Sequence, residues 1–317
     1  MQTTQKPVLK NAQDFIEFFR QGGEYYDRQY LPNLMAGTQP DPQALKVLGE
    51  ALLTDNQNVR RNIIRLLEDI ARLNHRAYEL RTPEVIDLMV GPGFAKLDSA
   101  RGDAMQLLRN YASTSTLSHY EDVFLQALKD GSEVIDLLLI AKAKPKGAWE
   151  EVDRLSRLPK WKSPSGSNWE SMRIARAALG DTKIEDEYIA DAEQKEEAGD
   201  VDGLLSSFDQ LTRIGTQRSL QAVCKYMRSP IIIDTSLEKR SIRLYVMQSL
   251  IYAFPEEWRM LDPSSVRKDE DYIRVEQFCE KATGVRYDKP RPPFFVSFAY
   301  RGDPPPVPPP PPLPSVP

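Results

Sequence analysis

The chain has 317 residues, about twice the length of a typical single domain, with 41% hydrophobic and 28% charged residues. Its formal net charge of −4 at pH 7 argues against nucleic acid as a partner, because nucleic-acid-binding proteins usually carry a basic excess. No apolar run approaches the roughly 20 residues that a membrane-spanning helix needs, so we expect no membrane partner. The first residues lead into no apolar signal-peptide core, and we therefore expect a cytoplasmic protein.

Residues 1–40 predict an N-terminal capping helix followed by a loop. The apolar pattern from Asp14 to Phe19 is typical of a helix, and Gly22-Gly23 would end it. Pro32 and Pro40 then predict a loop before the first repeat.

Residues 41–290 predict an internal helical repeat. Arg60, Arg101, Arg173 and Arg243 each stand at the start of an apolar pattern with helical spacing, and they are separated by 41, 72 and 70 residues. The two longer gaps are close to twice 35, and degenerate units at 134–139 and 203–211 would fill them. A repeat of about 35–41 residues is typical of two-helix solenoid units.

The motifs that carry this repeat resemble a known family. The segments 55–60 (Asp-Asn-Gln-Asn-Val-Arg), 172–181 and 214–223 look like HEAT repeats, and the second is similar to the bacterial variety related to phycobilin-lyase repeats. The resemblance covers about residues 41–260. It implies an all-α, HEAT-like α-solenoid of about five to six helical pairs, in which each pair buries an apolar face against its neighbours.

The resemblance also implies a role for individual charged residues. In such repeats an Asp and an Arg of adjacent units commonly form a ladder that keeps the stack in register. Asp55, Arg60, Arg173 and Arg243 would have that structural role here. The alternative is that one of these arginines contacts a partner.

Residues 142–176 combine nine basic residues with three of the four tryptophans. Lys160, Trp161 and Lys162 lie next to a Ser/Gly loop at 163–167, and a tryptophan beside cations is typical of binding hot spots. We therefore expect these three residues to contact a partner. Core packing of Trp161 is the alternative, and the contact surface would then lie around Arg218 and Gln221.

The stretch 181–202 carries ten acidic residues and two lysines. Glu185 and Glu187 are expected to dock a basic partner, because clusters of one charge sign speed and select association. The alternative is an ordinary solvated helix face.

Few residues suggest chemistry. The two cysteines, Cys224 and Cys279, lie at apolar helical positions and are expected to be buried free thiols, with a disulfide as the alternative. His75 and His119 are not spaced as metal ligands and are expected to have capping or surface roles. We find no nucleophile elbow and no phosphate-binding loop, so we expect no catalytic residues, no metal and no cofactor.

The C-terminal part changes character. Ile231–Ile233 predicts an extended link before a helix capped within 234–236, and Gly284 would end a last helix over 271–282. Residues 291–317 predict a disordered tail, and 304–317 contain ten prolines. A polyproline-reading domain is a candidate partner for that segment, and a spacer role is the alternative.

Together these features predict a non-catalytic scaffold or adaptor that binds another protein. One alternative is a solenoid enzyme related to chromophore lyases or base-excising HEAT proteins. The other is an inhibitor or toxin-neutralising protein that acts through its acidic surface.

Overall fold

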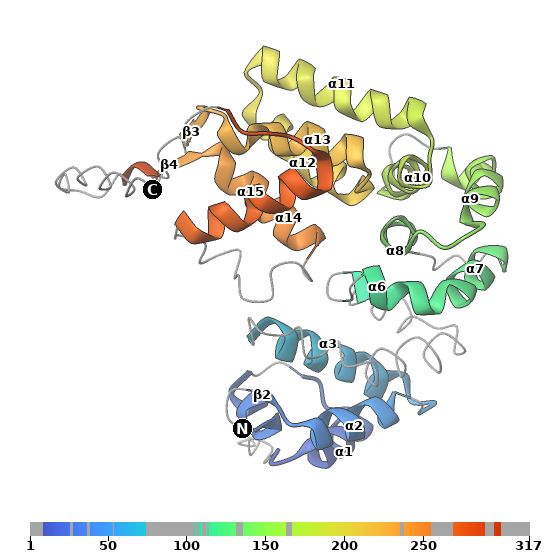
Figure 1. The fold of residues 1–317 in the computed structure, drawn as a ribbon. Coiled ribbons are helices and arrows are strands. Elements are labelled where there is room, and N and C mark those ends of the chain that lie inside the picture. Colours follow the sequence, from blue (N-terminus) through green and yellow to red (C-terminus); the bar gives the residue numbers. More distant parts are fainter. Residues whose placement is uncertain are drawn as a thin grey trace, which may run out of the picture.

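The protein is mainly helical, as predicted. The computed structural model describes residues 9–25, 28–36, 39–52, 54–73, 105, 108–109, 112, 114–130, 136–162, 167–234, 238–254, 269–288 and 295–298. Figure 1 shows these elements as an arc that runs from the N-terminal helices through α6–α11 to the C-terminal helices.

The α-helices in this part of the chain are α1 (Ala12–Arg20), α2 (Pro42–Ala51), α3 (Gln57–Leu73), α6 (Thr114–Leu117), α7 (Glu121–Lys129), α8 (Leu137–Ala143), α9 (Ala148–Ser156), α10 (Ser167–Ala178), α11 (Thr182–Ala198), α12 (Val201–Ile214), α13 (Gln217–Cys224), α14 (Ile242–Ala253) and α15 (Asp269–Thr283). The 3₁₀ helices are η1 (Arg28–Leu34), η3 (Ser118–Tyr120), η4 (Pro159–Trp161) and η5 (Lys225–Arg228). The strands are β1 (Met35–Ala36), β2 (Gln39–Pro40), β3 (Ile232–Asp234), β4 (Glu238–Ser241) and β5 (Phe295–Phe298).

The N-terminal helices form one packed unit, in which α1, α2 and α3 contact one another. The predicted helix is present, and its capping role stays a prediction: Asn11 accepts a hydrogen bond from the backbone N–H of Asp14 at its start, and the glycines at 22–23 follow its end. Asn58 on α3 donates to the carbonyl of Phe19 at 2.7 Å and to that of Gly23 at 3.2 Å, so α3 is hydrogen-bonded to the end of α1.

Consecutive helices in the middle of the chain are joined by a repeated two-residue signal. Gly199 and Gly215 have φ of 68° and 61°, a left-handed conformation that glycine adopts without strain, and they end α11 and α12. The next residues, Asp200 and Thr216, cap the following helices with their side chains. Gly180-Asp181 joins α10 to α11 in the same way. Each corner therefore stops one helix and starts the next without a longer loop.

Helix α12 lies at the centre of this half of the molecule. It contacts α8, α10, α11, α13 and α14, and its Phe208 and Leu211 are completely buried. The Phe208 ring lies 4.9 Å from the ring of Tyr226 on η5. The surrounding helices therefore share one apolar core with α12.

The C-terminal elements are fastened covalently. Cys224 at the end of α13 and Cys279 on α15 form a disulfide, and both residues are completely buried. Burial was predicted correctly, but the expectation of free thiols is wrong: the helical fold brings the two Cα atoms to 5.7 Å, within the range of a disulfide.

Two further expectations need correction. The Ile231–Ile233 segment is extended as predicted, but β3 pairs with β4, and the cap of α14 is Ser241 instead of a residue at 234–236. The predicted tail begins too early, because Phe295–Phe298 forms β5 and pairs with β4. Gly284 does end α15, with φ of 73°. Residues 304–317, Arg101 and His75 lie outside the described residues.

Candidate functional site

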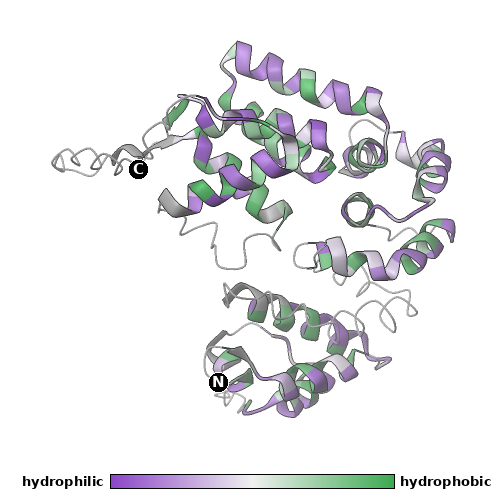
Figure 2. Ribbon diagram, in the orientation of Figure 1, coloured by the Kyte–Doolittle hydropathy of each residue, from purple (hydrophilic) through white to green (hydrophobic). Residues whose placement is uncertain are grey.

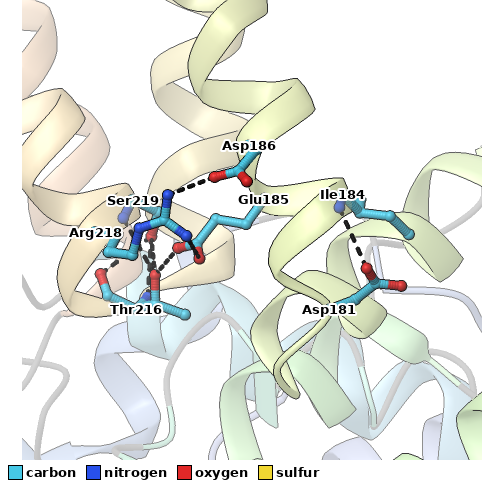
Figure 3. Close-up of polar contacts among 7 residues, drawn as sticks. All are labelled: Asp181, Ile184, Glu185, Asp186, Thr216, Arg218 and Ser219. Carbon is cyan, nitrogen blue, oxygen red and sulfur yellow. Dashed lines mark hydrogen bonds and ion pairs between the residues drawn. The ribbon is translucent and has the colours of Figure 1, made fainter.

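The corner between α12 and α13 is built by a reciprocal cap (Figure 3). The Thr216 hydroxyl accepts from the backbone N–H of Ser219 at 3.1 Å, and the Ser219 hydroxyl accepts from the backbone N–H of Thr216 at 2.9 Å. This arrangement satisfies two donors that the start of a helix would otherwise leave open. The corner is therefore rigid before any other helix touches it.

Helix α11 contributes a buried acid to this corner. The Glu185 carboxylate accepts a hydrogen bond from the Thr216 hydroxyl, and its other oxygen lies 3.3 Å from the guanidinium of Arg218. Arg218 also forms an ion pair with Asp186 on the next position of α11, as Figure 3 shows. Because a buried carboxylate is costly without partners, these contacts explain why Glu185 can be only 3% exposed.

A second set of contacts joins α11 to α10. Arg173 forms an ion pair with Glu187 at 2.7 Å, and its guanidinium lies 4.6 Å from the Trp169 ring centroid and 5.0 Å from that of Tyr188. The Tyr188 hydroxyl donates to Glu170 at 2.7 Å. Burial, together with this hydrogen bond to a carboxylate, raises the pKa of Tyr188 well above its ordinary value.

A third set joins α11 to η5. The Lys225 ammonium lies 3.5 Å from Glu193 and 3.7 Å from Glu196, and the Tyr226 hydroxyl donates to Glu196. Burial and this second phenol–carboxylate contact raise the pKa of Tyr226. Cations from α10, α13 and η5 thus hold α11 along its length.

The acidic stretch keeps a negative excess in spite of these pairs. Ten acidic residues and two lysines lie at 181–202, and the paired cations Arg173, Arg176, Arg218 and Lys225 add four positive charges, which leaves an excess of four negative charges. Asp186, Glu193 and Glu197 are exposed on α11, and Figure 2 shows this helix as largely hydrophilic. The arrangement is a rigid acidic face, which we call the α11 face and define by Asp186, Glu187, Glu193, Glu196 and Glu197.

The structure separates the residues that the sequence grouped together. Trp161 is only 6% exposed and belongs to the apolar core, so the expectation of an exposed anchor is wrong. Lys162 is exposed, and the side chain of Lys160 lies outside the description. Glu185 is buried and serves the corner, whereas Glu187 has a side chain that is 49% exposed. Of the two predicted acidic residues, Glu187 alone belongs to the α11 face.

The four residues of the predicted Asp/Arg ladder have different surroundings. Arg60 is buried, and its guanidinium donates to the carbonyl of Thr54 just before α3, whose preceding turn includes Asp55. Arg243 is completely buried with its guanidinium 4.0 Å from the Tyr272 ring centroid. Arg173 binds Glu187, an acid of the following helix. A ladder that joins equivalent positions of successive repeats stays a prediction.

Sequence reasoning missed Thr216 and Glu170 as partners of the α11 acids. The Thr216–Ser219 spacing is a capping signal that predicts the start of α13, but no sequence signal says that Glu185 reaches it from 31 residues away. Arg218 was named as a contact residue in case Trp161 proved to be buried, and it does lie at the edge of the α11 face, with its side chain 52% exposed. His119 is exposed, as expected.

No helix in the described part of the chain is long and apolar enough to cross a membrane. Among the same residues, no group of three His, Cys, Asp or Glu side chains is placed to hold a metal ion. Comparisons with protein-family models, curated proteins and solved structures find no match to this chain, so the HEAT resemblance depends on the motifs alone.

Proposed function

We propose that this chain is a non-catalytic protein–protein interaction scaffold, built as a HEAT-like α-solenoid, that binds a basic partner through the α11 face. The observation that carries the proposal is the excess of four negative charges in the stretch 181–202, most of which is a helix that neighbouring helices hold in place. A preorganised surface of one charge sign attracts and orients a partner of the opposite sign without first having to become ordered.

The packing of the helices supports the solenoid. Helices that follow one another in the chain contact one another, as in α10 with α11, α11 with α12 and α12 with α13. Such stacking leaves long faces open to a partner, and α11 lies on the outside of the arc in Figure 1. The number of helical pairs, five to six, stays part of this proposal.

The partner we favour is a protein. An acidic face repels the phosphate backbone of nucleic acid, which binds to basic surfaces. A polyproline-reading domain at 304–317 is proposed as a separate contact, because prolines there would present a preformed helix. Deletion tests should start at residue 304, since removing 291–317 would also remove β5.

The disulfide changes the proposed location. Disulfides persist in oxidising compartments and are rare in the cytosol, so the Cys224–Cys279 bond favours an oxidising compartment over the cytoplasm. The inhibitor alternative uses the same α11 face and differs only in its effect on the bound partner. The enzyme alternative requires a substrate pocket with a buried acid or cysteine beside aromatic rings, and both cysteines are committed to the disulfide.

The test is charge reversal on the α11 face with a matched control. The variant Glu193→Lys/Glu197→Lys should lose proteins that the unaltered chain captures from its source, whereas Glu50→Lys/Asp122→Lys, exposed acids on α2 and α7, should keep them. Both double variants change the net charge by the same amount. Equal capture by the two, with melting temperatures near that of the parent, would contradict the proposal.

A further inference from the structure

A cavity of about 190 Å³ lies between α8, α12 and α14, away from the α11 face. Its lining includes the apolar side chains of Leu138, Ile214 and Phe254. Four cationic residues also line the cavity: Arg109, Lys142, Lys144 and Arg213. Arg109 forms an ion pair with Asp136 at 3.0 Å and Arg213 forms one with Asp209, so the positive excess at the cavity comes from Lys142 and Lys144.

The cations are held in place by the surrounding structure. The Lys142 ammonium donates to the carbonyl of Arg109 at 2.8 Å, and the Lys144 ammonium donates to the carbonyl of Gly215 at 3.0 Å. The Arg213 guanidinium lies 2.7 Å from Asp209, one turn earlier on α12. An ammonium has three N–H donors, and the Gly215 carbonyl takes one of those of Lys144.

Lys144 is an unusual residue for its backbone position. It ends α8 with φ of 47° and ψ of 54°, and it is the one residue other than glycine with positive φ in the described part of the chain. Glycine is the ordinary residue in this conformation, because a side chain there is strained. Strained positions cluster at binding sites, so the conformation of Lys144 makes its side chain a candidate for one.

The Lys144 ammonium is also poorly solvated. Burial lowers the pKa of Lys144, and the nearby charge of Glu185 opposes that shift only in part. A buried ammonium of this kind gains when an anion enters, because the anion replaces the water that burial removes.

We propose that this cavity binds a small carboxylate that carries a single compact apolar group. A cavity of about 150 Å³ accommodates benzene, so 190 Å³ suits one ring or branched chain with its carboxylate. The carboxylate would lie against Lys144 and Arg213, and the apolar group against Leu138, Ile214 and Phe254. Inorganic phosphate fits less well, because it would leave the apolar wall exposed to water.

The probe is 3-phenylpropionate, titrated into the full chain by calorimetry, with 3-phenylpropionamide as its neutral match and inorganic phosphate as a plain anion. We expect the acid to bind at least about tenfold more tightly than the amide, because a hydrogen bond between two charged groups is stronger than one to a neutral amide. Phosphate should bind weakly. Equal binding of acid and amide, or tighter binding of phosphate, would overturn the proposal.

Three variants assign the site. Lys144→Gly relieves the backbone strain, which offsets the lost hydrogen bond to Gly215, so it should fold and still lose about tenfold in affinity for 3-phenylpropionate. Lys144→Arg should restore most of the binding. Lys146→Gln, which removes an exposed lysine two residues away, should bind as the parent does. If Lys144→Gly binds the acid normally, the lysine serves the helix end alone and the proposed site is wrong.

Discussion

Helices α11 and α14 both pack against the central helix α12, but different interactions hold them in place. The 17-residue α11 buries only Glu185, Tyr188 and Ala192, and ion pairs and phenol–carboxylate contacts hold it. The 12-residue α14 buries apolar side chains on most of its surface, and its one buried arginine lies against an aromatic ring. Figure 2 shows the contrast, with α11 largely hydrophilic and α14 largely hydrophobic.

The difference separates two ways of fixing a helix. Apolar burial is insensitive to salt and to pH, whereas contacts between partly exposed charges weaken as salt screens them. We therefore expect α14 and its neighbours to respond to changes in packing and covalent linkage, and α11 to respond to changes in charge. The following experiments test that division.

The largest effect should come from the disulfide that closes the C-terminal region. Replacing both Cys224 and Cys279 with Ser removes a link across 55 residues of chain, and the free energy of unfolding should fall by about 4 kcal/mol. Urea denaturation of the double variant measures this change. Treating the parent with a reducing agent should produce the same loss, and an unaltered midpoint in both cases would show that the link does not stabilise the fold.

Replacing Arg243 or Arg173 should lower the free energy of unfolding by less than this, and by different amounts. Arg243→Ala removes a fully buried guanidinium from the face of Tyr272 and leaves a cavity, so we expect a loss of about 3 kcal/mol. Arg173→Ala removes a partly exposed ion pair and two ring contacts, and about 1 kcal/mol is expected.

Raising the salt concentration should separate the effects of the two arginine substitutions further. In 1 M salt the cost of Arg173→Ala should shrink, because its pairing with Glu187 is already screened in the parent. The cost of Arg243→Ala should change less, because this side chain is completely buried and salt screens buried charges weakly. An Arg243 effect as salt-dependent as that of Arg173, or one smaller than that of Arg173, would contradict the division between the two helices.

Alkaline pH should act on α11. The pKa of Tyr188 is raised by burial and by its hydrogen bond to Glu170, whereas an unfolded tyrosine titrates near 10. Below pH 10 the phenol is neutral in both states, and the full stability is present. Above it the unfolded chain releases a proton that the folded chain keeps, so stability should fall by about 1.4 kcal/mol per pH unit. Melting temperatures between pH 9 and 11 should drop less steeply for Tyr188→Phe than for the parent.

The sequence predicted the local structure better than the site. Helix ends were readable because a glycine just after an apolar helical pattern is a signal within a few residues, as at Gly22-Gly23 and Gly284. Trp161 was misread for the opposite reason. A tryptophan between two lysines has the same local pattern whether it faces solvent or the core, and only the packing of distant helices decides.

The same limit applies to the acids of α11 and to the cysteines. The composition at 181–202 predicted a charged helix, but the ion partners come from α10, α13 and η5. Cys224 and Cys279 are separated by 55 residues, and spacing alone does not show that they meet. Contacts between residues far apart in the chain are set by the fold as a whole and carry no local signature.

The glycine corners at 180, 199 and 215 also determine how changes in chain length spread through the molecule. The corners at 199 and 215 each pass from one helix to the next with a single glycine and a single capping residue, and the corner at 180 adds only Leu179, so none of them has a longer loop that could absorb an extra residue. An insertion at Gly199 or Gly215 would therefore displace the later helices relative to α11 and would separate Glu185 from Thr216.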